Sequence, residues 1–243
     1  IAGPVLSQNR SPAAAAGTNI IVFGNEFFDA LPVELIDHRG LVLVGEDGGQ
    51  FVETFAAPPA EQLQFLDRYS ILPERGERVE TALASLDWMD RVLVTLRARR
   101  GFAVFLDYGY TREEQLAGRH RGTLMTYRQH KASPSPYEAP GEQDITAHVN
   151  FTALHARAKE SGLKPPPLVT QSQFLIGIGE STQFADAFQD CRLPQERAKV
   201  ALQLKHLVTP AGVGETFQVL LLAGEVDEAA LSGLSGLKLA HWR

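Results

Sequence analysis

The sequence has only one cysteine, Cys191, in 243 residues. A single thiol cannot form an internal disulfide, and it cannot supply the cluster of thiolates that structural zinc sites use. Low cysteine usage is typical of proteins from reducing compartments. It favours a bacterial cytoplasm or a mitochondrial matrix, with the cytoplasm as the first expectation. The Ala-rich residues 1–18 resemble a transit peptide in composition, but a linker is the favoured interpretation because prolines and Gly17 interrupt any helix.

The chain also lacks long apolar runs and an excess of basic residues. No run approaches the roughly 20 apolar residues of a transmembrane helix, so no membrane span is predicted. Lys and Arg number 23 against 29 Asp and Glu, which gives a formal net charge of -6 and a pI near 5.7. Proteins that bind nucleic acids in general need a basic face, so a nucleic-acid partner is not expected.

Several common catalytic motifs are missing. The segments 177–179 and 212–214 each match part of a dinucleotide-binding fingerprint, but neither has the third glycine at the required spacing. The sequence contains no phosphate-binding loop, no His-Glu-x-x-His and no Gly-x-Ser-x-Gly. Its histidines are scattered, so no metal site is predicted. The one grouping that could converge is His130, Asp144 and His148, in or beside a long loop.

The apolar segments alternate along the chain between two types, short continuous runs typical of strands and longer patterns with helical spacing. Residues 19–24 and 102–106 are short runs of the kind found in buried parallel strands, and 216–222 is a final strand candidate. Apolar residues at helical spacing predict helices over 77–100 and 194–208. This alternation favours an α/β layered fold in one large domain over residues 1–243.

The intervening segments have weaker patterns. Residues 33–55 are predicted to form two or three short antiparallel strands. Residues 111–147 are polar and rich in Pro and Gly, and they are predicted to form a long loop of the kind that is usually functional. Asn150 is expected to cap a helix over 151–161. The irregular tail over 231–242 is expected to pack through Leu234, Leu237 and Trp242.

Three acids follow the two central strand candidates. Glu26 and Asp29 come just after the first, and Asp107 comes just after the second. Because the carboxyl ends of parallel strands meet at one edge of a sheet, these acids are expected to face one crevice. An alternative interpretation reads Glu26 and Asp29 as the acidic N-terminus of a helix, where the helix dipole favours negative charge. The position of Asp107 after the next strand favours the first interpretation, in which these acids form a site.

The segment 25–33, Asn-Glu-Phe-Phe-Asp-Ala-Leu-Pro-Val, resembles the signature of the MidA-like methyltransferases. This S-adenosylmethionine-dependent family includes a mitochondrial assembly factor for respiratory complex I. The order and rough spacing of further blocks match from about residue 19 to 222. These blocks are 107–109, 122–124 with Tyr127, Arg128 and His130, 140–141, 144–151 and 171–175.

The resemblance implies a class I methyltransferase fold, which is Rossmann-like, with a mostly parallel seven-stranded sheet and an antiparallel last strand. Residues 19–24 would be the fourth strand and 102–106 the fifth, with family-specific insertions at about 33–75 and 111–147. The implied cofactor is S-adenosylmethionine. Members carry a glycine-rich loop that holds this cofactor, and no such loop precedes Asn19. The domain is therefore expected to be partial at its N-terminus.

The resemblance also implies methylation of arginine in a protein substrate. By analogy with the acidic loop of other arginine methyltransferases, Glu26 and Asp29 would be catalytic and grip the guanidinium, because a carboxylate can pair with it bidentately. Asn25 and Glu26 would contact the cofactor. The predicted substrate-binding residues are Asp107, Tyr108, His130, Asp144 and His148, and no residue is assigned to a metal.

The implied partner is a protein substrate, with a subunit of respiratory complex I as one candidate. Whether the chain forms a homodimer is left open by the sequence. A hypothesis of a different class is a non-catalytic assembly or scaffold protein that retains the fold. In that case residues 33–55 and 111–147 would be its contact surfaces.

Overall fold

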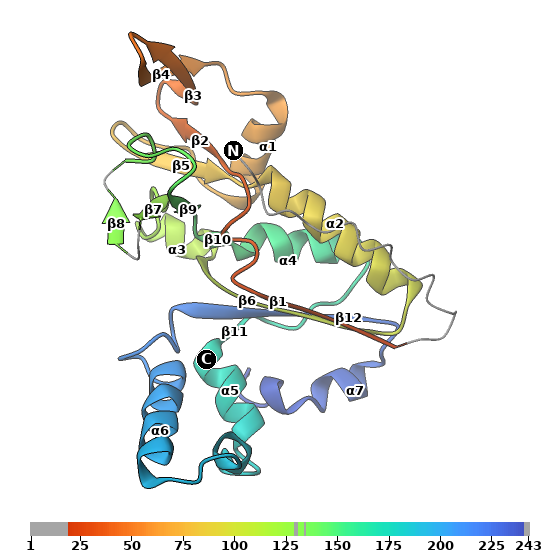
Figure 1. Ribbon diagram of the computed structural model, residues 1–243. Coiled ribbons are helices and arrows are strands. Elements are labelled where there is room, and N and C mark those ends of the chain that lie inside the picture. The colour runs from red at the N-terminus through yellow and green to blue at the C-terminus, as the bar shows by residue number, and fades with distance from the viewer. Residues whose placement is uncertain (1–18, 129–130, 134, 241–243) are drawn as a thin grey trace. The chain divides into compact units, whose positions relative to one another are not determined.

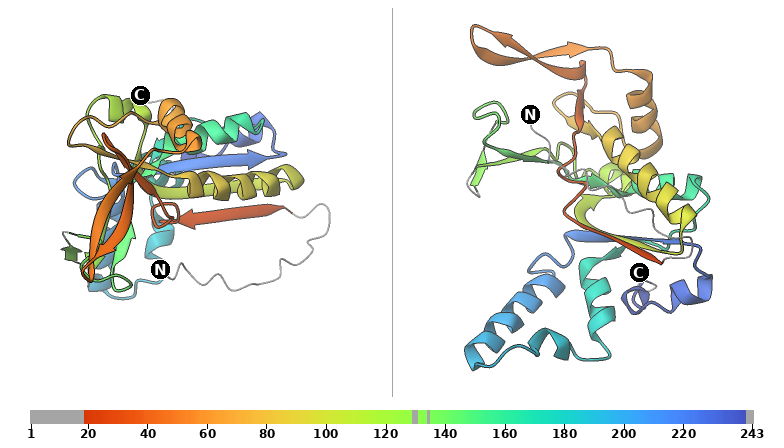
Figure 2. Two further views of the ribbon diagram at one scale, coloured as in Figure 1. Left: turned by 90° about the horizontal axis from the view of Figure 1, so that it is seen from above. Right: turned by 45° about the vertical axis from the view of Figure 1, so that its right-hand side comes forward.

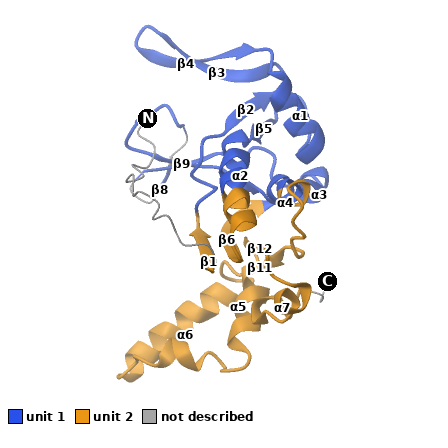
Figure 3. Ribbon diagram, turned by 90° about the vertical axis from the view of Figure 1, so that its right-hand side faces the viewer, with its two compact units in different colours: residues 1–18, 27–91, 110–157 blue, residues 19–26, 92–109, 158–243 orange. Residues whose placement is uncertain are grey.

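The structure is a computed structural model that describes residues 19–128, 131–133 and 135–240 (Figures 1 and 2). The chain divides into two compact units, each assembled from separate stretches of sequence (Figure 3). The described part of unit 1 lies within residues 27–91 and 110–157, and that of unit 2 lies within 19–26, 92–109 and 158–240. Each unit is described by itself below.

Unit 2 is built on a mixed sheet with the strand order β1-β6-β12-β11. Strand β1 (Ile20–Asn25) is parallel to β6 (Gly101–Tyr110). Strand β12 (Phe217–Gly224) is antiparallel both to β6 and to β11 (Val169–Thr170). Hence β1, β6 and β11 share one direction and β12 opposes them. This arrangement confirms the predicted Rossmann-like α/β class, and β1 and β6 are strands where the sequence predicted them. The predicted burial of β1 is wrong for the described residues, because β1 is the edge strand and Ile21 and Phe23 are 76% and 67% exposed.

The sheet of unit 2 buries its apolar side chains against the C-terminal part of the chain. One core cluster joins Leu106, Val169, Val219, Leu221 and Leu237, with Leu234 packed against it. The predicted packing of the tail through Leu234 and Leu237 is therefore confirmed, while Trp242 lies outside the described residues. At the end of β12, a side chain on Gly224 would overlap the carbonyl group of Leu96. Glycine at this position lets a helix end approach the strand closely.

The helices of unit 2 follow local signals in the sequence. Thr170 caps α5 (Gln171–Gly179), since its hydroxyl accepts a hydrogen bond from the Gln173 N–H. Helix α6 (Pro194–Val208) begins at a proline, as predicted, and lies beside α5 (Figure 2). The remaining helices of this unit are η1 (Ala185–Phe188), α7 (Glu228–Ser232) and η2 (Ser235–Leu237).

Unit 1 contains an antiparallel sheet with the order β4-β3-β2-β5. Its strands are β2 (Glu34–Asp37), β3 (Gly40–Asp47), β4 (Gln50–Ala56) and β5 (Arg78–Thr81). The first three confirm the strands predicted over 33–55. The position of β5 shows that the predicted helix over 77–100 starts too early, because α2 (Leu83–Ala98) begins only after this strand. Val79 is fully buried and pairs with Ile36 in the sheet, so tertiary pairing overrides the helical pattern.

The segment 111–147 is not the long loop that its composition predicted. It contains α3 (Arg112–Leu116) and a small sheet with the order β8-β7-β9. The strands are β7 (Met125–Arg128), β8 (Lys131–Ser133) and β9 (Asp144–Thr146). These strands are only three or four residues long, and Met125 pairs with Thr146 across 21 positions. No local apolar pattern indicates such a pairing, which explains why sequence reasoning missed it.

The remaining elements of unit 1 are α1 (Ala60–Tyr69), β10 (Val149–Asn150) and α4 (Phe151–Glu160). Asn150 caps α4 as predicted, because its side-chain oxygen accepts a hydrogen bond from the Ala153 N–H at 3.0 Å. Among the described residues, no helix is both long enough and apolar enough to span a bilayer.

Candidate active site

Glu26 stands directly after β1 at the carboxyl end of the parallel pair. Its N–H donates to the carbonyl oxygen of Leu106 at 3.0 Å, which continues the pairing with β6. The backbone of Glu26 is left-handed, with a φ of 48°, an uncommon conformation for a residue other than glycine. The side chain is exposed, and its carboxylate accepts a hydrogen bond from the Asn25 carboxamide at 3.1 Å. The fold thus presents a carboxylate and a carboxamide together at the strand end.

Asp107 and Tyr108 lie at the same end of the sheet in unit 2. Asn25 pairs with Leu106, and β6 continues beyond this pair to Tyr110, so Asp107 lies within the strand and pairs with Gln218 of β12. The expectation that Asp107 follows the strand is therefore wrong, because pairing with β12 extends β6 past residue 106. Asp107 is only 1% exposed, and its carboxylate accepts a hydrogen bond from the Tyr108 N–H at 3.0 Å. The Tyr108 ring meets Phe217 edge to face. Asp107 is therefore part of the interior of the described chain, whereas Glu26 is open to solvent.

Asp29 belongs to unit 1, where it is 4% exposed. Its carbonyl oxygen accepts a hydrogen bond from the Ala147 N–H at 3.0 Å. This bond joins the turn after Phe28 to the segment that carries Asp144 and His148. Asp144 is exposed at the start of β9, and His148 is partly buried. His130 lies outside the described residues.

His148 forms a contact that the sequence did not indicate. Its Nδ1 lies 3.1 Å from Nδ1 of His120, and the His120 ring stacks on Tyr110. The His148 N–H donates to the Thr123 hydroxyl at 3.0 Å. Burial lowers the pKa of both imidazoles, and for His148 the neighbouring His120 lowers the pKa further. The pair is therefore arranged to share a hydrogen bond while uncharged.

Glu80 is a buried acid that the sequence did not single out. It is 2% exposed, and one of its carboxylate oxygens accepts hydrogen bonds from the N–H groups of Thr123 and Leu124, at 2.6 and 2.9 Å. The other oxygen has no hydrogen-bond partner among the described residues. Burial raises the pKa of Glu80 despite these two donors. No local signal indicated this role, because the run from Arg78 to Thr81 contains a single apolar residue, Val79, and so shows no strand-like alternation.

Acidification is expected to destabilise the folded chain through the pair formed by His120 and His148. The pKa of each imidazole lies below its ordinary 6.5 in the folded chain, so the unfolded chain takes up protons first as the pH falls. The free energy of unfolding should therefore decrease from about pH 6.5 downward until the folded-state pKa values are reached. Urea unfolding between about pH 7.5 and pH 5 measures this slope, which should be shallower in His148→Asn. The exposed His38 supplies the control His38→Asn, and equal slopes in wild type and His148→Asn would contradict the prediction.

The chain resembles known proteins over most of its length. A family model with the description "Putative S-adenosyl-L-methionine-dependent methyltransferase" matches residues 8–169. The chain is 27% identical over 231 residues to "Protein arginine methyltransferase NDUFAF7 homolog, mitochondrial" of Drosophila melanogaster, covering 88% of this chain and 51% of that protein. It is 27% identical over 213 residues to "Protein arginine methyltransferase NDUFAF7, mitochondrial" of Mus musculus, covering 83% and 45%. The chain thus spans about half the length of these curated relatives.

Two solved structures from Burkholderia thailandensis resemble the chain. An uncharacterized protein superposes with a TM-score of 0.74 at 30% identity, over 92% of this chain and 59% of that one. A likely methyl transferase bound to S-adenosyl-homocysteine superposes with a TM-score of 0.69 at 27% identity, over 93% and 58%. Both carry the fold expected from the sequence. Since the family model matches well over half of its residues, the chain belongs to the MidA-like family of S-adenosylmethionine-dependent methyltransferases.

Proposed function

We propose that this chain provides the substrate side of an S-adenosylmethionine-dependent protein arginine methyltransferase. The observation that carries the proposal is the exposed carboxylate of Glu26, held beside Asn25 at the carboxyl end of β1 and β6. In open α/β sheets this end of the strands is where ligands bind. The names of the curated relatives, protein arginine methyltransferases, support arginine as the acceptor.

The chemistry of methyl transfer suits an exposed carboxylate. Attack of a nitrogen on a sulfonium methyl group is an in-line displacement, so catalysis depends mainly on positioning. A guanidinium is always charged and presents a planar fork of donors, which a carboxylate binds with two parallel hydrogen bonds. Glu26 would hold the substrate arginine in this way and aim one nitrogen at the methyl group. Asp29, three positions further along the chain, is the second proposed catalytic carboxylate.

The polar groups at the end of β1 can form the hydrogen bonds that the cofactor requires. S-adenosylmethionine would supply the methyl group, and it carries an ammonium and hydroxyl groups that need hydrogen-bond acceptors. Asn25 and Glu26 are exposed acceptors at the strand end. We assign cofactor contacts to these two residues. Substrate contacts remain proposed for five residues: Asp107, Tyr108, His130, Asp144 and His148.

The proposal also covers the domain organisation, the protein substrate and the cellular compartment. Residues 1–243 would form one catalytic domain with insertions at about 33–75 and 111–147. A subunit of respiratory complex I, implied by the family resemblance, is the candidate protein substrate. The curated relatives are mitochondrial by name, which supports the mitochondrial alternative, while the solved bacterial relatives are consistent with a bacterial cytoplasm.

The test uses the intact protein with methyl-labelled S-adenosylmethionine and two peptides that differ only in carrying arginine or lysine. We expect label in the arginine peptide alone, with the added methyl group located on the guanidinium by fragmentation mass spectrometry. Transfer to the lysine peptide alone would overturn the arginine assignment. Calorimetry with the cofactor gives an independent reading, because an intact protein that binds no cofactor would support the scaffold hypothesis instead.

A further inference from the structure

Glu215 lies at the same end of the unit 2 sheet as Glu26, on the far side of β6 and β12. One row of residues crosses the sheet by pairing in turn: Asn25, Leu106, Val219 and Val169. Glu26 follows this row on β1, and Thr170 follows it on β11, which runs in the same direction. The Thr170 hydroxyl donates to the Glu215 carboxylate at 3.3 Å. The two glutamates therefore stand at the carboxyl ends of β1 and β11.

The separation of these two positions follows from the spacing of the strands. Because β6 and β12 lie between β1 and β11, three spacings of about 4.8 Å place Glu26 and Thr170 about 14 Å apart. An extended peptide advances about 3.4 Å per residue, so this distance corresponds to about four residues. A peptide that crosses this end of the sheet can therefore place one side chain at Glu26 and another at Glu215.

Glu215 is carried by a loop that is fixed within unit 2, between α6 and β12 (Figure 1). The Ser172 N–H, near the start of α5, donates to the Gly214 carbonyl oxygen at 2.8 Å. A side chain on Gly212 would overlap the His206 carbonyl group, so glycine lets the loop fold back closely on α6. These contacts account for the glycines at 212 and 214, and they hold Glu215 in a defined position.

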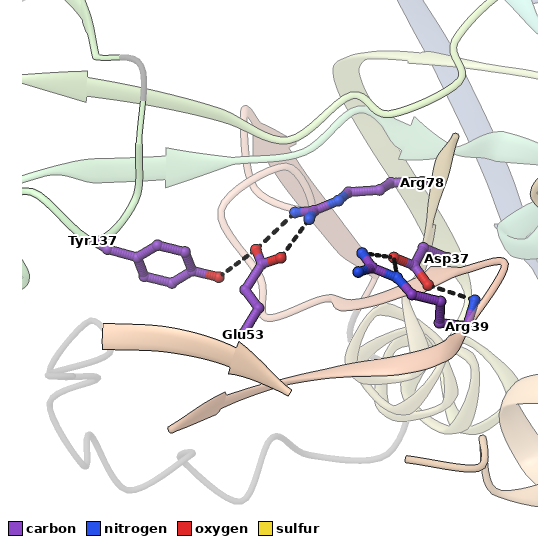
Figure 4. A network of polar contacts seen from close by, with 5 residues as sticks. All are labelled: Asp37, Arg39, Glu53, Arg78 and Tyr137. Atoms are coloured by element: carbon purple, nitrogen blue, oxygen red, sulfur yellow. Dashed lines mark hydrogen bonds and ion pairs between the residues drawn. The ribbon is translucent and has the colours of Figure 1, made fainter. Parts of the chain in front are cut away.

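Two acids of unit 1 are already paired with arginines of the chain (Figure 4). Glu53 accepts hydrogen bonds from Arg78 at 2.8 Å and from the Tyr137 hydroxyl at 3.0 Å. Asp37 accepts a hydrogen bond from the Arg39 guanidinium at 3.0 Å. A carboxylate that is occupied by a guanidinium in this way is not open to a second one. We therefore exclude Glu53 and Asp37 as sites for a basic group of the substrate.

Glu26 and Glu215 differ from these acids because each forms a hydrogen bond with an uncharged side chain. The partner is a carboxamide for Glu26 and a hydroxyl for Glu215. Both glutamates are exposed, so their negative charges are open to solvent. On the strands between them, the half-buried rings of Tyr108 and Phe217 meet edge to face, with centroids 5.6 Å apart. This end of the sheet thus carries two negative groups with an aromatic pair between them.

We propose that Glu215 is a specificity-determining residue that binds a second basic side chain of the substrate, about four positions from the target arginine. The inference rests on the proposed function, in which Glu26 binds the target guanidinium. A carboxylate at this place attracts lysine or arginine and repels an acidic side chain. Because Glu215 is remote from the acceptor nitrogen, it contributes to substrate binding and not to the methyl-transfer step.

The test compares peptides that contain one target arginine and differ at a single flanking position, with the intact protein and labelled S-adenosylmethionine. Lysine is placed four positions before the arginine in one peptide and four positions after it in another. In one of these two peptides, lysine should lower KM about threefold relative to alanine at low salt and leave kcat unchanged. Lysine directly beside the arginine cannot span the two glutamates and should have a smaller effect. The preference should decline as salt is added.

Charge reversal at position 215 tests the residue itself. Glu215→Lys should invert the preference, so that a peptide with glutamate at the favoured position has a lower KM than the peptide with lysine there. Glu225→Lys makes the same charge change at an exposed position beyond the other end of β12, and it should keep the wild-type preference.

The outcomes separate this inference from the proposed function. Arginine methylation that does not depend on the flanking charge would overturn the role of Glu215 and leave the proposed function standing. A lysine preference that persists in Glu215→Lys would do the same. If no arginine peptide is methylated at all, the proposed function fails, and this inference fails with it.

Discussion

Replacing Glu26 by glutamine is expected to lower methyl transfer to arginine about 100-fold or more, because the amide loses the charge-assisted pair with the guanidinium. Glutamine has the same shape and tolerates the exposed position, so the fold should be unaffected. Initial rates with labelled cofactor and an arginine peptide measure the effect. The loss should appear in kcat as well as KM, because the carboxylate both binds and aims the acceptor nitrogen.

The chain offers a matched control for this substitution in Glu225. This residue is also an exposed glutamate with a left-handed backbone, with a φ of 53°, and it follows β12 in the same unit. Glu225→Gln should therefore retain wild-type rates. Undiminished activity in Glu26→Gln would remove Glu26 from the proposed role, while an equal loss in both variants would indicate an indirect effect of removing surface charge.

Replacing Glu80 by alanine is expected to lower the free energy of unfolding by about 3 kcal/mol. The substitution leaves the N–H groups of Thr123 and Leu124 without their acceptor in the interior of unit 1, and it also creates a cavity. Urea unfolding at neutral pH measures the loss. Glu61→Ala, at an exposed position of α1, serves as the control and should change the stability little.

The ionisation of Glu80 adds a pH dependence to this prediction. Its pKa is raised above the ordinary 4.5, so the folded chain holds this proton more tightly than the unfolded chain does. The stabilising contribution is complete below about pH 4.5 and is lost as the pH rises through the folded-state pKa. Glu80→Gln keeps an acceptor for both N–H groups but cannot ionise. The free energy of unfolding of Glu80→Gln should therefore increase relative to that of wild type as the pH rises. A difference between the two that stays constant across this pH range would refute the predicted effect of Glu80 ionisation.

The local parts of this fold were predictable because their signals are short and strong. An apolar run with β-branched residues predicted β1, and a proline at the first helical position predicted the start of α6. Asn150 likewise predicted the start of α4 through its capping geometry. In the site, the stretch from Asn25 to Asp29 was singled out by its position after a strand. The sequence did not show which of its two acids would be exposed, because Glu26 and Asp29 have similar side chains and lie only three positions apart.

The sequence by itself determined the family, the mixed sheet with its opposing last strand, and the carboxylate at the end of β1. Each of these rests on residues that are adjacent in the chain or on motifs in a fixed order. Only the tertiary structure decided that residues 78–81 form a strand, that Glu80 binds Thr123 and Leu124, and that His120 meets His148. These contacts join residues 28 to 47 positions apart. They arise from burial and pairing between distant segments, which no local pattern of side chains encodes.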